Sequence, residues 1–249
     1  MATAEVALRS SKPRRRRRPL RFFFLGMALF AAAIVLAAFV PEFRRYAAGT
    51  FPIAPILHVH AAIMAAWVGA FAFQAYLGAT GQTALHRRAG PYAVAIAVVA
   101  CLSMVFVELR ALIVHPLPQG GRDLDWLLPG PLVYLIVPIF LAWGVHERRR
   151  PQWHKRLMTF ALFLSLLAPI ERFLWIPADR GFLPFIAVLD LCLLVPMLSY
   201  DLLTRAGRLH PATIRATLLL LAGEAILFSL WGTDSWHRFA SVAAQRIHG

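Results

Sequence analysis

The chain has 249 residues, of which 59% are hydrophobic and only 15% are charged, and its formal net charge is +14. The apolar residues gather in long stretches, a pattern that excludes a water-soluble globular domain and predicts an integral membrane protein. Both cysteines, Cys101 and Cys192, lie inside apolar stretches, so disulfide, CxxC redox and zinc–thiolate chemistry are not expected.

Seven apolar stretches are candidates for crossing a bilayer, which takes roughly 17–25 residues of helix. Lipid cannot hydrogen-bond to backbone N–H and C=O groups, so each crossing must be helical. We therefore predict an all-α integral membrane helical bundle of about seven transmembrane helices. In chain order the crossings are Leu20–Val40, Pro55–Ala79, Gly90–Leu109, Gly130–Val145, Leu157–Ile170, Phe182–Leu203 and Thr213–Trp231. Pro169 and Pro196 are expected to interrupt the fifth and sixth crossings.

Three regions follow from this pattern. Residues 1–19 are polar and basic, which predicts a disordered cytoplasmic tail, and residues 20–232 form the transmembrane domain. Residues 233–249 place Trp236 and Phe239 at helical spacing, so we expect an outer-face tail that forms an interfacial helix.

Most of the 26 Lys and Arg residues precede the first crossing or lie in the loops after crossings two, four and six. Cytoplasmic loops carry the excess of basic residues, so the N-terminus is predicted inside and the C-terminus outside. Each charge of the Arg14–Arg18 run contributes about 1 kcal/mol of attraction to anionic lipids. Lipid headgroups thus account for the net charge, and no nucleic-acid partner is expected. The strong preference for Arg over Lys, together with abundant Ala, suggests a GC-rich bacterial genome. We therefore expect the membrane to be a bacterial inner (cytoplasmic) membrane.

A short pattern recurs where the third and fifth crossings begin: His86 and His154 are each followed by two basic residues and an apolar helix. A duplicated helical hairpin would produce this pattern, as would the preference of inner helix starts for basic residues. The two helices run in the same direction, so the imidazoles lie at the same depth. Iron in a bis-histidine haem needs one imidazole from each side, and we predict that His86 and His154 are its ligands. Small residues along both helices suit either a flat macrocycle or close helix packing.

A second polar layer lies towards the outer face. His58 and His60 begin the second crossing about 200° apart around the helix, so they cannot share one face. His60 heads a polar and aromatic stripe that we expect in the bundle interior, and His58 heads a stripe of small residues. Both are candidates for cofactor binding.

Two acidic residues, Asp190 and Glu224, lie well inside predicted crossings. Asp190 and Glu224 fall roughly 10–12 Å below the outer surface, where a charge costs several kcal/mol unless it is paired or protonated. We therefore treat both acids as candidate catalytic residues, with Arg172 as their counter-ion. The alternative is a neutral acid that joins helices through hydrogen bonds.

Residues 55–172 carry HVH, a Trp, a Gln, HRRAG and then HKRLM followed by ER. This series resembles the HxH, Trp, Gln, HRRxG and HKRLM signposts of an uncharacterised group of bacterial polytopic inner-membrane proteins. More distantly, the histidines resemble those of transmembrane b-type cytochromes, which implies haem b. In the di-haem ascorbate-type family, paired helices supply both ligands at each face. His86 and His154 match the inner pair, whereas the fourth crossing has no outer histidine to match His58 or His60.

The leading hypothesis is a redox-linked membrane protein with b-type haem between its helices, electron transfer in the membrane, and protons or a quinone handled by His60 and the two intramembrane acids. One alternative is a proton- or ion-coupled transporter that uses these acids. Two others are a metal-dependent intramembrane enzyme with His58 or His60 and acids as ligands, and a non-catalytic assembly subunit.

Overall fold

The structure, a computed structural model, describes residues 18–49, 53–114 and 124–248, and within these ranges it contains helices and no strand. The prediction of an all-α chain is confirmed for this part of the sequence. Most of the predicted N-terminal tail, including Arg14–Arg17 of its basic run, lies outside the described residues.

Within the described ranges, six helices are long and apolar enough to cross a membrane. They are α1 (Phe23–Ala47, preceded by the 3₁₀ turn η1, Arg18–Phe22), α2 (Pro55–Thr80), α3 (Thr83–Val114), α5 (Pro129–His146), α8 (Leu183–Thr204) and α9 (Pro211–Leu230). Several extend beyond the predicted crossings, because polar first turns such as that of α3 are helical although they are not apolar.

The fifth predicted crossing, Leu157–Ile170, is the exception. It is divided between α6 (Pro151–Leu164) and the single turn α7 (Leu167–Ile170), neither of which reaches the length of a membrane span. The break fits the expectation for Pro169, whose ring clashes with the carbonyl four residues earlier, at Ser165. The expected interruption at Pro196 is wrong, since α8 continues through this residue.

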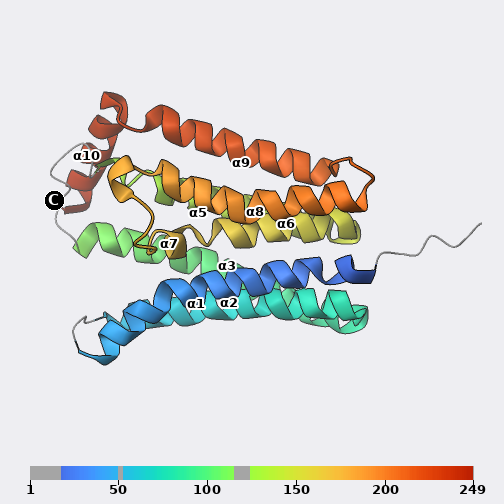
Figure 1. Ribbon diagram of the computed structural model, residues 1–249. Coiled ribbons are helices and arrows are strands. Elements are labelled where there is room, and N and C mark those ends of the chain that lie inside the picture. Colours follow the sequence, from blue (N-terminus) through green and yellow to red (C-terminus); the bar gives the residue numbers. More distant parts are fainter. Residues whose placement is uncertain (1–17, 50–52, 115–123, 249) are drawn as a thin grey trace, which may run out of the picture.

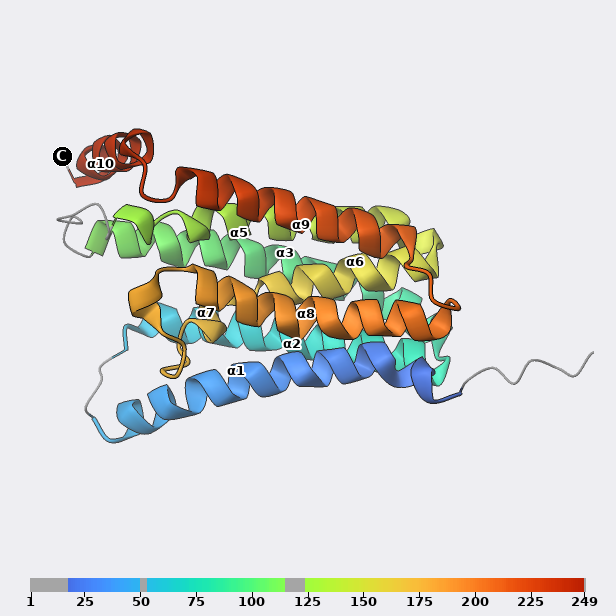
Figure 2. The same ribbon diagram turned by 45° about the horizontal axis from the view of Figure 1, so that its top comes forward.

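The long helices lie side by side and alternate in direction (Figures 1 and 2). One end of the bundle, here called the N-terminal end, holds the start of α1, the α2–α3 turn, the α5–α6 connection with η2 (Glu147–Arg149), and the α8–α9 turn. The opposite end, called the α10 end, holds the C-terminal helix α10 (Asp234–His248) and the link between α7 and α8 with η3 (Ala178–Arg180). α6 and α7 together run between the two ends.

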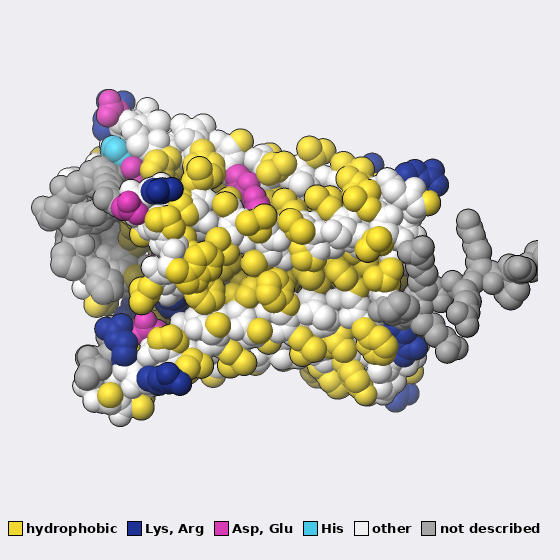
Figure 3. All heavy atoms as spheres, viewed as in Figure 1, with side chains coloured by type: hydrophobic (Ala, Val, Ile, Leu, Met, Phe, Trp, Pro, Cys, Tyr) yellow, Lys and Arg dark blue, Asp and Glu magenta, His cyan; other side chains and the backbone are white. Residues whose placement is uncertain are grey.

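The central helix of the bundle is α6. It packs against α1, α5, α8 and α9, and every residue from Thr159 to Leu164 is buried. The outer faces of the surrounding helices are also apolar: Leu36 and Leu102 are 64% and 65% exposed. Figure 3 shows hydrophobic side chains along the length of the bundle. Apolar residues both inside and outside are expected where lipid surrounds the helices.

The predicted C-terminal helix is present as α10, and a buried carboxylate fastens its start. Asp125 Oδ1 accepts hydrogen bonds from Gly232 N at 2.8 Å and from His237 Nε2 at 2.9 Å. Trp236 Nε1 donates to the carbonyl of Leu124 at 2.9 Å. These contacts hold α10 against the segment that precedes α5.

Candidate functional site

The structure brings together the two histidines that the sequence places at one depth. His86 is the fourth residue of α3 and His154 the fourth of α6, so the two helices present them from equivalent first turns. Their ring centroids lie 6.2 Å apart, with the ring planes at 84°. The pair, which we call the histidine pair, lies at the N-terminal end of the bundle.

Hydrogen bonds define the tautomer of each ring. His86 Nδ1 lies 3.2 Å from the carbonyl oxygen of Gln74 on α2, and His154 Nδ1 lies 2.7 Å from that of Gly144 on α5. A carbonyl can only accept, so Nδ1 carries the hydrogen in both rings, and in the neutral ring Nε2 keeps the lone pair. In each helical hairpin, α2–α3 and α5–α6, the histidine is thus oriented by a hydrogen bond to a backbone carbonyl of the first helix.

The glycine at position 144 permits this arrangement on the α5–α6 side. A Cβ atom there would lie 2.8 Å from Met158 Sδ and 3.4 Å from Leu157 Cβ. Real Cβ atoms do not approach other heavy atoms so closely, so a side chain at this position would force Met158 or α6 itself to shift. Glycine therefore sets the spacing that lets His154 reach the α5 carbonyl.

Gln74, whose backbone carbonyl accepts the hydrogen bond from His86, also has a side chain without hydrogen-bond partners among the described residues. Both amide atoms of Gln74, Oε1 and Nε2, are inaccessible to solvent and have no hydrogen-bond partner among the described residues. Gln74 follows the buried Trp67 and Phe71 along one stripe of α2. A buried amide normally has partners, so these atoms are available to a polar group that the described residues do not supply.

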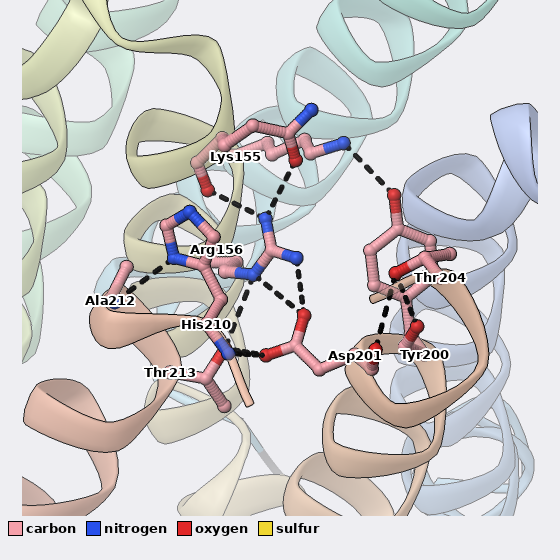
Figure 4. Close-up of polar contacts among 9 residues, drawn as sticks. Lys155, Arg156, Tyr200, Asp201, Thr204, His210, Ala212 and Thr213 are labelled. Atoms are coloured by element: carbon pink, nitrogen blue, oxygen red, sulfur yellow. Dashed lines mark hydrogen bonds and ion pairs between the residues drawn. The ribbon is translucent and has the colours of Figure 1, made fainter. Parts of the chain in front are cut away.

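A second polar cluster at the same end of the bundle escaped the sequence analysis. Arg156 of α6 and Asp201 of α8 are 1% and 0% exposed and form an ion pair (Figure 4). Asp201 Oδ1 accepts from Nε and Nη2 of Arg156, and Oδ2 accepts from His210 N and from the hydroxyl of Thr213 on α9. The carboxylate is fully satisfied, so the cluster joins three helices and leaves no open ligand position.

The α8–α9 turn contributes His210 to this cluster. Its Nδ1 accepts a hydrogen bond from Ala212 N at 3.0 Å and thereby caps α9. Burial, aided by the positive charges of Arg156 and Arg205, lowers the pKa of His210 to about 4. The ring is therefore neutral at neutral pH, as its role as a hydrogen-bond acceptor requires.

Lys155, which follows His154 directly, is also turned into this region. Its ammonium donates to the hydroxyl of Tyr200 at 3.1 Å and lies 4.5 Å from the ring centroid of Phe24 on α1. By contrast, Arg87 and Arg88, which follow His86, are exposed. These two arginines, like Arg150 just before α6, are basic side chains near the histidine pair that remain open to solvent.

The outer histidines do not form a common site. The ring of His58 packs against Tyr46, with centroids 5.0 Å apart, whereas His60 Nδ1 lies 3.1 Å from Ser103 Oγ of α3. The Ser103 hydroxyl donates to the carbonyl of Ala100, so its oxygen accepts from His60. His60 thus points into the bundle, as its stripe predicts, but serves there to join two helices.

The acids predicted inside the membrane do come together, but without the predicted counter-ion. The carboxyl groups of Asp190 and Glu224 interact across the α8–α9 contact. Arg172 instead donates to the carbonyl of Ala168 and lies over the ring of Phe39, 4.6 Å from its centroid. No contact among the described residues joins Arg172 to either acid, because the shared depth on which the expectation relied does not specify which side of a helix faces which neighbour.

The described ranges contain no group of three or more His, Cys, Asp and Glu side chains arranged to hold a metal ion. The hypothesis of a metal-dependent enzyme built on the outer histidines and acids therefore has no geometric support. No family model matches the chain, and no match was found among curated proteins or solved structures.

Proposed function

We propose that this chain is a multi-pass protein of the bacterial inner membrane that binds one b-type haem between His86 and His154 and transfers electrons at the cytoplasmic side. One observation carries the proposal: two imidazoles lie 6.2 Å apart on parallel helices, and the Nδ1 atom of each donates to a backbone carbonyl. The following arguments support it.

The first support is the spacing of the rings. An iron or zinc ion lies roughly 2 Å from an imidazole nitrogen, and the ring centre lies about 1 Å further on. Two imidazoles that held one metal ion between them would have ring centres about 6 Å apart, and the observed separation is 6.2 Å.

The second support is the pattern of hydrogen bonds. Histidines that bind metals almost always donate their other N–H to a carbonyl or carboxylate, which fixes the tautomer and orients the ring. Both histidines meet this condition through the carbonyls of Gln74 and Gly144. The same bonds leave the Nε2 lone pair of each neutral ring for a ligand, and no donor among the described residues bonds to either one.

The number of ligands favours haem over a bare metal ion. Structural zinc takes four protein ligands and catalytic zinc three, and the described residues provide no third His, Cys, Asp or Glu beside the pair. Haem iron requires only axial ligands from the protein. Two histidines alone are therefore sufficient for haem and insufficient for zinc.

The surrounding residues fit the proposed group. The unpartnered amide of Gln74 would bind a polar substituent, and the exposed Arg87 and Arg88 would neutralise carboxylates at the membrane surface. The haem supplies a one-electron couple when it is bound. The chain orients the two imidazoles, and its apolar helices limit the access of water.

The membrane arrangement follows from the charges. The start of α1 and the turns after α2, α5 and α8 all lie at the N-terminal end, and they carry most of the basic residues. We infer that this end is cytoplasmic and that it contacts anionic lipids. We also infer that α6 and α7 together form a seventh crossing, surrounded by the other helices. Electrons would pass to a redox partner at this face.

The absorption spectrum of the purified full-length protein tests the proposal. Protein expressed with ample haem is expected to show a Soret band, which His86→Ala and His154→Ala each abolish. His58→Ala is the matched control, because it removes a helical histidine at the α10 end. Absence of the band from folded wild-type protein, or a wild-type spectrum in both inner variants, would contradict the assignment.

A further inference from the structure

Two acids lie at one depth in the apolar part of the bundle, remote from the histidine pair. Asp190 is seven residues from the start of α8, and Glu224 is six residues from the end of α9. At 1.5 Å per residue, both lie roughly 10 Å inside the α10 end. Figure 3 shows acidic side chains among the hydrophobic ones at mid-length of the bundle.

The surroundings of Glu224 are hydrocarbon. Its side chain is 7% exposed and borders a small cavity. The other residues that line this cavity come from α5 to α9 and are all apolar. Glu224 is therefore the one titratable residue that lines this cavity.

The hydrogen bonds of the two acids are incomplete. Oδ1 of Asp190 and Oε1 of Glu224 are inaccessible and have no hydrogen-bond partner among the described residues. The two carboxyl groups interact with each other. Two carboxylates side by side in a medium of low dielectric constant would repel strongly.

We propose that Asp190 and Glu224 form an intramembrane proton-binding site, in which the two carboxyl groups share one proton. The shared proton removes one negative charge and provides the donor that the two acids otherwise lack. The site does not depend on the proposed haem, which lies at the other end of the bundle.

The ligand is a proton rather than a metal ion because of the available oxygens. Hard cations such as Ca²⁺ take six to eight oxygen ligands, and the cavity beside Glu224 is otherwise lined by apolar side chains. A proton needs just one donor and one acceptor oxygen. A proton is therefore the cation that two carboxyl groups in apolar surroundings can bind.

Labelling with a hydrophobic carbodiimide tests the proposal on the full-length protein in lipid vesicles. Carbodiimides of this kind react with protonated carboxyl groups in apolar surroundings. We expect an adduct on Glu224 or Asp190, and none on Asp201, which is anionic and bound to Arg156. Glu224→Gln and Asp190→Asn keep the shape of each side chain and should each reduce total labelling several-fold. Thr217→Val, which alters another incompletely bonded side chain of α9, should leave labelling unchanged.

Infrared spectroscopy provides a second measurement that does not depend on reagent access. At neutral pH the wild-type protein should show the carbonyl stretch of a protonated carboxyl group, and this band should be absent from the Asp190→Asn/Glu224→Gln double variant. Either the selective adduct or the loss of the band supports the site. Absence of both in protein that elutes as a folded species would overturn it, whatever the haem content.

Discussion

Arg156 of α6 and Asp201 of α8 form an ion pair in which both partners are buried: their side chains are 1% and 0% exposed. The carboxylate receives four hydrogen bonds in total, from Arg156, His210 and Thr213. The guanidinium also donates to the backbone carbonyl and the side chain of Gln152. This relationship fixes the N-terminal ends of α6 and α9 relative to the end of α8, and hence the helix that carries His154.

Removing one partner of this pair is expected to destabilise the protein strongly. Asp201→Ala leaves a buried guanidinium without its counter-ion, and such changes cost about 3–5 kcal/mol. Thermal unfolding in detergent would measure the loss. The control is Arg150→Ala, which breaks the more exposed pair with Glu147 and should change stability by about 1 kcal/mol or less. Equal effects of the two substitutions on thermal stability would argue against a stabilising role for the buried Arg156–Asp201 pair.

The stability of the α8–α9 turn should depend on pH through His210. Its pKa is about 4 in the folded protein, against the ordinary value of 6.5. Below pH 6.5 the unfolded chain binds a proton that the folded chain excludes, so stability falls as the pH decreases from 6.5 to 4. His210→Asn keeps a side-chain oxygen that can cap α9 but cannot titrate. The melting temperature of the variant should therefore fall less than that of the wild type over this range, and parallel curves would contradict the assignment.

A side chain at position 144 should disturb the histidine pair from a distance. In Gly144→Ala the new Cβ would meet Met158 Sδ, and overpacking of this kind costs about 1–3 kcal/mol. We expect α6 to shift, His154 to lose its carbonyl acceptor, and the Soret absorbance per chain to fall.

Gly69→Ala on α2 is the matched control, because no atom lies within 4 Å of its added Cβ. It should leave the spectrum unchanged and stabilise the helix by roughly 0.5–1 kcal/mol. If both alanine variants retain the wild-type spectrum, the spacing at Gly144 has no bearing on the pair.

Removing the buried carboxylate at position 125 should release α10. Asp125→Ala deletes the acceptor used by Gly232 and His237, so amide hydrogen exchange within residues 234–248 should accelerate while α9 stays protected. Asp179→Ala, an acid in η3 at the same end, should leave exchange in α10 as in the wild type. Unchanged protection after removal of Asp125 would mean that Trp236 alone holds the helix.

The depth of polar residues could be predicted from the sequence because helix rise converts residue number into distance. For this reason His86 and His154, and likewise Asp190 and Glu224, were expected at matching depths, and each pair does come together. The prediction of a break at Pro169 succeeded because proline acts on its own helix, four residues back.

The sequence did not reveal which sides of the helices meet. Arg172 has a depth compatible with the acids, yet it faces Phe39 of α1. Arg156 was indistinguishable from the basic residues that flank any inner helix start, and its partner Asp201 lies on another helix. A signal was present in the four-residue spacing of Leu193, Met197 and Asp201, which are all buried on α8. Rotational orientation and neighbour choice come from packing, so they appear only in the structure.

The haem content of the purified protein tests the central claim most directly. Full-length protein from haem-replete cells, assayed as the pyridine haemochrome, is expected to contain one haem per chain, and the His86→Ala/His154→Ala double variant should contain none. Folded wild-type protein without haem, or a double variant with the wild-type content, would contradict the account.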